Sequence, residues 1–363
     1  MSGRRLLGSL DLPTVLTALA LVGIGVYAIA SATIEQPSLA GLWRAQVIWF
    51  LVAAVGGLIV LLVDYRFWAG IALGLHGTVI ALLGLVLFVG KEVGGNRSWL
   101  ELGPGRLQPS ELAKWTTCLV LAAYLARRVR GHIGLRHLLE MSVLVGLPVV
   151  LIAAQPDMGT ALIFLPIFAA ALVMGGMRWK VAAGFVILGL LLAPVAWTQL
   201  RDYQKERIIS VVDPERDPSG VGYQVRQSKI AIGSGGLVGK GPFAGTQSQL
   251  NFLPAQHTDF VLAVVAEELG FMGAAGVLLL FYCLFYRGVI VANSAQDRLG
   301  TYICLLVVAW IIGQMAVNVG MVLGRLPTIG VPLPLMSYGG SSMVAIVCGL
   351  ALILSVRARR FVN

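Results

Sequence analysis

The sequence predicts an all-α membrane protein, a bundle of about ten transmembrane helices with a large outer loop between the seventh and eighth spans. Of its 363 residues, 58% are hydrophobic and only 12% are charged, whereas soluble domains carry about 25% charged residues. Apolar runs of roughly 18 or more residues recur along nearly the whole chain, and each can cross a hydrocarbon core about 30 Å thick as a helix. We therefore expect residues 1–363 to form a single integral membrane domain.

The positions of the apolar runs predict the individual spans. The first run follows Arg4 and Arg5 and could be taken for a signal peptide. Its apolar core is longer than that of a typical signal peptide and further spans follow, so we expect a retained helix. The predicted spans are 12–32, 45–63, 68–90, 109–126, 138–155, 158–176, 181–200, 262–286, 300–323 and 340–356.

The charge balance predicts topology. The chain has 27 Lys and Arg against 17 Asp and Glu, a net charge of +10. In a soluble protein this excess would suggest nucleic acid, which we do not expect as a partner here. The basic residues concentrate in the short connectors that alternate with Gly- and Pro-rich segments, so the positive-inside rule places both termini in the cytoplasm.

Common ligand motifs do not fit this sequence. The four cysteines all lie in predicted spans, without Cys-x-x-Cys spacing or a nearby His, so we expect neither a disulfide nor a zinc site. The glycine-dense run 233–241 is not a nucleotide-binding loop, because Ser234 replaces the first Gly of the Walker motif and Gly241 replaces its Ser or Thr. The sequence predicts no metal site built from protein ligands.

The long outer loop, about 201–258, carries basic residues beside its glycines. The backbone N–H groups of the glycine-dense run, together with Arg226, Lys229 and Lys240, could surround a pyrophosphate. The alternative is a merely flexible loop. Both interpretations remain open from the sequence.

A second cluster begins the predicted span 109–126. Pro109 suits the first turn of a helix, so Glu111 and Lys114 lie three residues apart on one face. They either form a buried ion pair that fixes helix packing or line a polar cavity for substrate. Arg97, just outside the membrane, either binds a phosphate or acts as an interfacial anchor beside Trp99.

Acidic side chains at the membrane boundary are the candidates for chemistry. Asp259 directly precedes a long apolar run, where it could act as a general base on a sugar hydroxyl or cap the next helix. Asp157 lies in a tight turn, where capping is the commoner role. Glu267 and Glu268 lie about two turns deeper, in positions that are costly for charge, and either line a cavity or pair with basic residues.

The last outer segment repeats Pro and Gly between two predicted spans. This pattern indicates a reentrant segment, which is tolerated at membrane depth only when protein or a wet cavity covers it. Ser337 in this segment is a further candidate site residue. Gln314 and Asn318, four residues apart in the preceding span, are expected to hydrogen-bond between helices.

Taken together, these motifs resemble those of the SEDS family (shape, elongation, division and sporulation proteins), and specifically its RodA-type peptidoglycan glycosyltransferases. The resemblance covers nearly the whole chain. The matching segments are Asn96-Arg97-Ser98-Trp99-Leu100, Gln108-Pro109-Ser110-Glu111, Gln155-Pro156-Asp157, Gly222-Tyr223-Gln224, Gly245-Thr246-Gln247-Ser248-Gln249-Leu250, His257-Thr258-Asp259-Phe260, Pro332-Leu333-Pro334 and Ser337-Tyr338-Gly339-Gly340-Ser341.

The resemblance implies an activity and a setting. The family polymerises lipid II into undecaprenyl pyrophosphate-linked glycan strands during cell elongation and rod-shape maintenance. Its catalytic aspartate matches Asp259, its glutamate and lysine match Glu111 and Lys114, and its loop arginine matches Arg97. The implied partners are a class B penicillin-binding protein and other elongation-complex proteins, in the bacterial inner membrane with the active site on the outer face.

The expected reaction is an inverting transfer, for which a single displacement with one base suffices. Asp259 would deprotonate the acceptor 4-hydroxyl, and the leaving pyrophosphate would meet positive charge from Arg97, Lys114, Arg226 or Lys240. A divalent cation, Mg²⁺ or Mn²⁺, could assist, held mainly by substrate phosphates. The rival function is a lipid II flippase, although polar residues concentrated toward the outer face favour chemistry there.

Overall fold

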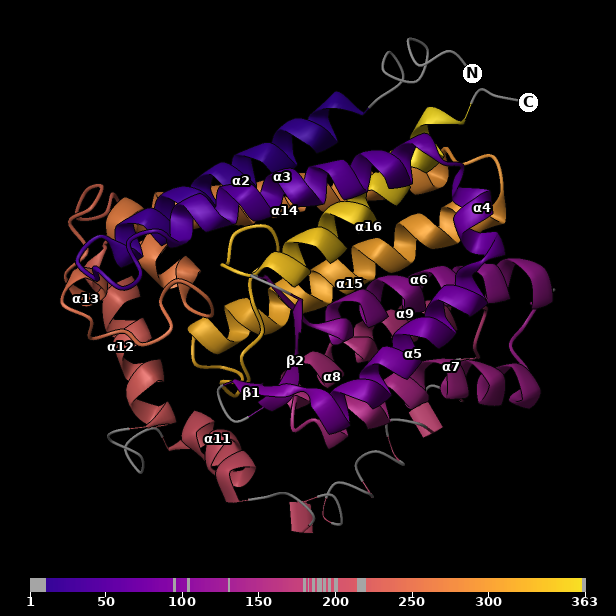
Figure 1. The fold of residues 1–363 in the computed structure, drawn as a ribbon, viewed down its shortest axis with the longest axis horizontal. Coiled ribbons are helices and arrows are strands. Elements are labelled where there is room, and N and C mark those ends of the chain that lie inside the picture. The colour runs from indigo at the N-terminus through magenta and orange to yellow at the C-terminus, as the bar shows by residue number, and fades with distance from the viewer. Residues whose placement is uncertain are drawn as a thin grey trace.

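The computed structural model describes residues 11–93, 96–102, 105–129, 131–178, 202–213 and 220–360, with isolated positions between 181 and 198. Its long helices run along one common direction (Figure 1). The long helices are α2 (Leu12–Thr33), α3 (Leu42–Leu62), α5 (Ala72–Val89), α6 (Pro109–Arg128), α7 (Leu135–Ala154), α14 (Val261–Asn293), α15 (Arg298–Val322) and α16 (Gly340–Ala358). The shorter ones are α4 (Tyr65–Gly70), α8 (Met158–Leu162), α9 (Phe164–Met174), α11 (Asp202–Val212), α12 (Val221–Ser234) and α13 (Thr246–Gln249).

Within the described residues, 7 helices are long and apolar enough to cross a membrane, namely α2, α3, α5, α7, α14, α15 and α16. This makes the chain a multi-pass membrane protein. The other three predicted spans are not among these helices, for a different reason in each case. The span 109–126 forms α6, a mostly buried helix with charged residues at both ends. The span 158–176 is divided into α8 and α9 at Ile163, and 181–200 lies mostly outside the described residues.

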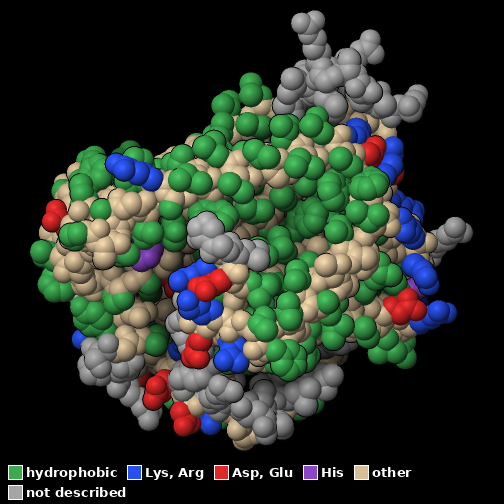
Figure 2. Space-filling model, in the orientation of Figure 1, with side chains coloured by type: hydrophobic (Ala, Val, Ile, Leu, Met, Phe, Trp, Pro, Cys, Tyr) green, Lys and Arg blue, Asp and Glu red, His purple; other side chains and the backbone are tan. Residues whose placement is uncertain are grey.

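Ion pairs join several helices at one end of the bundle, which we call the charged end. Asp11 before α2 pairs with Arg287 of α14 and lies 3.9 Å from Arg357 of α16. Arg66 of α4 pairs with Asp297 before α15 at 3.0 Å. Lys and Arg side chains gather along this edge in Figure 2, while hydrophobic side chains cover the middle. α12 and α13 lie at the opposite end (Figure 1), which we call the loop end.

The all-α prediction was wrong in one detail, because the segment between α5 and α6 forms a small antiparallel sheet. Its strands are β1 (Lys91–Val93), β2 (Asn96–Leu102) and β3 (Gly105–Leu107), in the order β1-β2-β3. Cross-strand neighbours carry opposite charges, Glu92 facing Arg97 and Glu101 facing Arg106. Such pairs favour strand pairing in a segment too polar to continue either helix.

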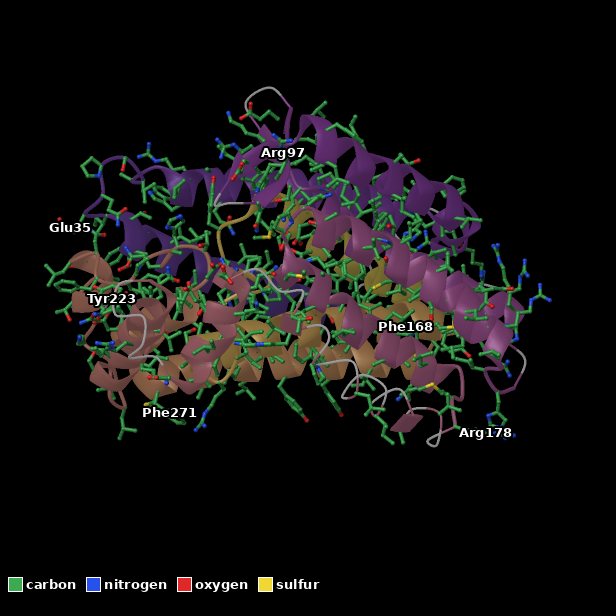
Figure 3. All side chains as sticks on the ribbon, turned by 90° about the horizontal axis from the view of Figure 1, so that it is seen from below. Glu35, Arg97, Phe168, Arg178, Tyr223 and Phe271 are labelled. Carbon is green, nitrogen blue, oxygen red and sulfur yellow. The ribbon has the colours of Figure 1, made fainter. Side chains whose placement is uncertain are left out.

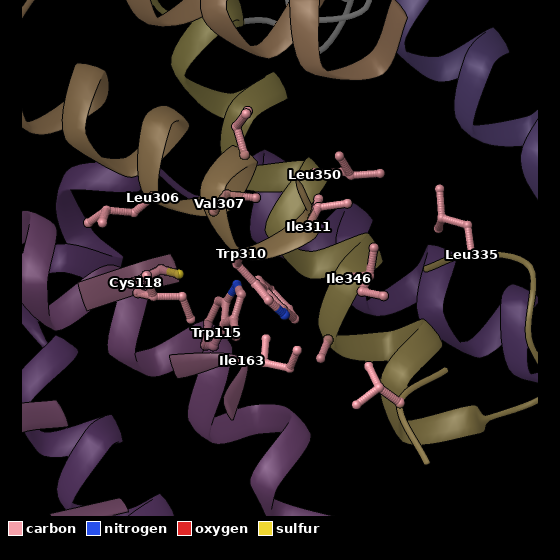
Figure 4. Close-up of a cluster of buried hydrophobic side chains, with 14 of the residues drawn as sticks. Trp115, Cys118, Ile163, Leu306, Val307, Trp310, Ile311, Leu335, Ile346 and Leu350 are labelled. Carbon is pink, nitrogen blue, oxygen red and sulfur yellow. The ribbon is translucent and has the colours of Figure 1, made fainter. Parts of the chain in front are cut away.

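Side chains from α6, α15 and α16 pack together in the core (Figure 4), where Trp310 is fully buried. Its indole N–H donates a hydrogen bond to Gln314 Oε1 at 3.0 Å. The Nζ atom of Lys114 lies 5.7 Å from the centroid of the Trp310 ring. The apolar core therefore directly adjoins the polar groups of α6.

α14 is interrupted at Gly270, which has φ 68° and ψ −166°. This backbone conformation is essentially restricted to glycine. Segment 236–241 of the long loop pairs with the backbone groups on both sides of the break, as buried peptide groups require. After the break, the N–H of Phe271 donates to the carbonyl of Gly236 at 2.9 Å, and the N–H of Met272 donates to that of Leu237 at 3.1 Å. Before the break, the carbonyl of Glu267 accepts from the N–H of Lys240 and the carbonyl of Glu268 from the N–H of Gly241, both at 3.0 Å.

We expect Gly270→Ala to destabilise the protein by about 2–4 kcal/mol, because of the glycine-only conformation and a steric clash. A Cβ there would lie 2.3 Å from Gly239 N and 2.5 Å from Leu237 O. The matched control is Gly276→Ala in the same helix, where a Cβ meets nothing within 4 Å. Thermal unfolding in detergent measures both variants. Equal melting temperatures would contradict the role given to Gly270.

Candidate active site

Asp259 lies directly before α14, and its backbone is held by residues far away in the sequence. The side-chain N–H of Asn318 in α15 donates to the carbonyl of Asp259 at 2.9 Å and to that of Val331 at 2.8 Å. Asn318 is fully buried. It therefore joins Asp259 to residues 324–339, the segment between α15 and α16 that the sequence predicts to be reentrant.

The carboxylate of Asp259 is half-buried and makes no hydrogen bond or ion pair within the part of the chain that the structure describes. Burial raises its pKa to about 6, against the opposing effect of the Arg207 charge on α11. The predicted alternative, a helix cap, does not hold, because Phe260 occupies the N-cap position of α14 without a side-chain cap. An unpaired carboxylate with this pKa suits a general base near neutral pH.

Segment 324–339 packs against the residues before Asp259. Ser337 Oγ donates to the carbonyl of Thr258 and accepts from the N–H of Leu333 at 2.8 Å. Gln46 of α3 donates to the carbonyl of Ser337 at 3.0 Å. Ser337 therefore positions the backbone beside Asp259. Sequence reasoning missed Gln46, whose only signal was an amide inside an apolar span.

A second set of contacts links the same segment to the pair on α6. Gln314 of α15 donates to the carbonyl of Pro332 at 3.0 Å and accepts from Lys114 Nζ at 3.0 Å. Lys114 Nζ also donates to Glu111 Oε1 at 2.7 Å, and both side chains are at most 2% exposed. Glu111 Oε2 is buried without a hydrogen-bond partner among the described residues. Of the two sequence interpretations, the structure favours the buried ion pair.

Asp157 has the capping role that the sequence favoured. Its carboxylate accepts from the N–H and the hydroxyl of Thr160, at 3.1 and 2.9 Å, at the start of α8. It also accepts from Gln108 at 3.0 Å. Burial raises the pKa of Asp157, and the nearby charge of Glu111 acts in the same direction.

The two deeper glutamates are engaged within the protein. Glu267 accepts from Lys240 Nζ at 2.6 Å and from the N–H of Gln247 at 2.9 Å. Glu268 accepts from the hydroxyls of Tyr27 and Ser31 on α2. The backbone N–H groups of Lys240 and Gly241 bond to α14, so the predicted phosphate cradle was wrong for these two groups. They instead fix the loop to the break in α14.

The remaining basic candidates do not form one cluster. Arg226 and Lys229 are exposed on α12, and a Cβ added at Gly324 would lie 2.4 Å from Lys229 Cε, which places Lys229 against segment 324–339. Arg97 on β2 is exposed, and Figure 3 shows it well apart from Tyr223 of α12. Arg207, which acts on the pKa of Asp259, was not predicted, because no spacing distinguishes it from its charged neighbours in α11.

No group of three or more His, Cys, Asp or Glu side chains placed to hold a metal ion occurs among the described residues. Those residues therefore do not provide a closed metal site, and a cation bound there would need ligands from the substrate.

The fold and the site define a multi-pass membrane protein that holds an unpaired carboxylate, the candidate general base, beside a buried polar network. Residues 12–361 match the profile of the FtsW, RodA and SpoVE family, described as a cell cycle protein. The chain belongs to this family.

Relatives and solved structures agree with the family assignment. The peptidoglycan glycosyltransferase MrdB of Escherichia coli K12 is 42% identical over 81% of this chain and 80% of its own. The probable peptidoglycan glycosyltransferase FtsW of Nitrosococcus halophilus is 37% identical over 95% of this chain and 92% of its own. In a solved structure of a peptidoglycan synthase complex that coordinates polymerization and crosslinking, the matching chain is 32% identical, with a TM-score of 0.84 over 98% of this chain and 99% of that one. The crystal structure of Thermus thermophilus RodA gives a TM-score of 0.73 at 29% identity, over 98% of each chain.

Proposed function

We propose that this chain catalyses peptidoglycan glycosyl transfer, with Asp259 as the general base. The chain is a peptidoglycan glycosyltransferase of the RodA type. The observation that carries the residue assignment is the unpaired, half-buried carboxylate of Asp259, whose pKa of about 6 keeps it ionised at neutral pH.

The reaction assigns separate roles to the groups around Asp259. Asp259 removes the proton of the acceptor 4-hydroxyl, the oxygen attacks the anomeric carbon, and the pyrophosphate leaves with the electron pair of the broken bond. We assign the stabilisation of the leaving charge to the exposed cations Arg226 and Lys229, on the helix that contacts segment 324–339. Lys114 is buried and acts through packing, and Lys240 is already paired with Glu267.

The substrate, partners and topology belong to the same proposal. The substrate is lipid II, and the partner is a class B penicillin-binding protein, in line with the synthase complex that the fold resembles. We place the charged end in the cytoplasm because of its Lys and Arg residues, and hence Asp259 on the outer face. α6 and the pair α8–α9 supply two further spans, with the described part of the loop 201–258 outside.

The test is reconstitution of the purified chain with its partner and lipid II, with polymer length and lipid translocation measured separately. Because Asp259 must be ionised, the rate should fall about tenfold per pH unit below its pKa and level off above it. Arg207→Gln should move the midpoint of this profile to higher pH, since the Arg207 charge lowers the pKa of Asp259. Translocation without polymer at every pH would support the flippase instead.

A further inference from the structure

The charged end contains a cavity that the proposed reaction does not use. It has a volume of about 440 Å³ and lies between α4, α5, α6 and α7. Its wall is almost entirely apolar, while its polar groups come from the last turns of α6 and the first turns of α7. The lining includes Ala72, Leu73, Val120, Ala123, Val143 and Leu144. α6 begins beside the network of Asp259 and ends here, so the cavity is separate from the candidate active site.

The edge of the cavity carries uncompensated positive charge. Arg127, Arg128 and Glu140 all line it. Glu140 accepts hydrogen bonds from Arg136 Nε at 2.8 Å and from the hydroxyl of Tyr124 at 2.7 Å. Three arginines against one glutamate leave two positive charges. Arg127 and Arg128 are exposed and form no ion pair within the described ranges.

We propose that this cavity binds one anionic glycerophospholipid from the leaflet at the charged end. One acyl chain lies between α4, α5, α6 and α7, and the phosphate contacts Arg127 and Arg128. The volume falls within the range of about 300–1,000 Å³ that ligand pockets occupy. A guanidinium group matches a phosphate geometrically and holds it by charge-assisted hydrogen bonds. The apolar wall offers nothing to a sugar or a nucleotide, and an uncharged transmembrane helix would leave both arginines unused.

The test measures lipid binding rather than polymerisation. The purified full chain in detergent is mixed with equal amounts of phosphatidylglycerol and phosphatidylcholine that have the same acyl chains, and bound lipid is counted by native mass spectrometry. We expect one phosphatidylglycerol to be retained in preference to phosphatidylcholine. Each arginine near an anionic headgroup contributes about 1 kcal/mol, so Arg127→Gln with Arg128→Gln should weaken this binding about 30-fold.

Two controls separate the site from general surface charge and from misfolding. Arg178→Gln with Arg298→Gln also removes two exposed arginines, neither of which lines the cavity, and should retain the lipid. Gly70→Leu should exclude it, because Gly70 lines the cavity and its added side chain meets open space. Gly74→Leu should still bind the lipid, because its added side chain also meets open space but Gly74 does not line the cavity.

Three results would overturn the proposal. These are no lipid on the wild-type chain, equal retention of both lipids, and unchanged phosphatidylglycerol binding in the Arg127 and Arg128 double variant or in Gly70→Leu.

Discussion

Asp259→Asn is expected to reduce glycan polymerisation by about 10²- to 10⁴-fold, the usual contribution of a general base. The amide keeps the size of the carboxylate but cannot accept the proton of the acceptor hydroxyl. Stability should change little, because the carboxylate makes no hydrogen bond or ion pair among the described residues. Burial of the charged Asp259 carboxylate, which raises its pKa, has a desolvation cost, and the neutral amide removes that cost. A loss of activity with an unchanged melting temperature is therefore the expected combination.

The matched control is Asp213→Asn, which makes the same substitution at an exposed residue of the long loop. It should polymerise at the wild-type rate. Polymer formation from lipid II in reconstituted membranes, together with thermal unfolding, measures both variants. Full activity in Asp259→Asn would remove the base from the mechanism, and a large fall in melting temperature would show that the aspartate serves the fold.

The sequence located the polar groups better than it identified their partners. The spacing of Glu111 and Lys114 placed both side chains on one helix face, since residues three apart on a helix are neighbours, but it left open whether they form an ion pair or line a cavity. The junction of polar loop and apolar run likewise singled out Asp259. The partners of both sites come from distant segments, such as Gln314, 200 residues from Lys114. No local pattern encodes such a contact, because it depends on how whole helices pack.

The break in α14 could not be predicted from the sequence for a related reason. Glycine is frequent in membrane helices, so Gly270 gives no signal of its own in an apolar run. Its conformation depends on segment 236–241, which supplies partners for the backbone groups that the break exposes. The sequence also does not show that two N–H groups of the glycine-rich loop are bonded to α14. For this reason the loop was a candidate for binding a pyrophosphate.

Lys114→Met should destabilise the fold by about 3–5 kcal/mol, because it leaves Glu111 buried and charged without its partner. The same substitution at Lys91, whose pair with Glu101 is about half exposed on both sides, provides the matched control. An exposed pair contributes at most about 1 kcal/mol, so Lys91→Met should shift the melting temperature little. Equal shifts in the two variants would show that the α6 pair does not stabilise the fold.

The double variant Glu111→Leu with Lys114→Met tests whether the pair acts through packing alone or also contacts the substrate. Replacing both partners with apolar side chains removes the buried charges together, which is often neutral or stabilising, so the melting temperature should recover. Gln314 keeps its contacts with Trp310 and Pro332, so segment 324–339 should stay in place beside Asp259. If polymerisation recovers with stability, the pair acts through packing alone. A stable but inactive double variant would mean that Glu111 or Lys114 contacts the substrate.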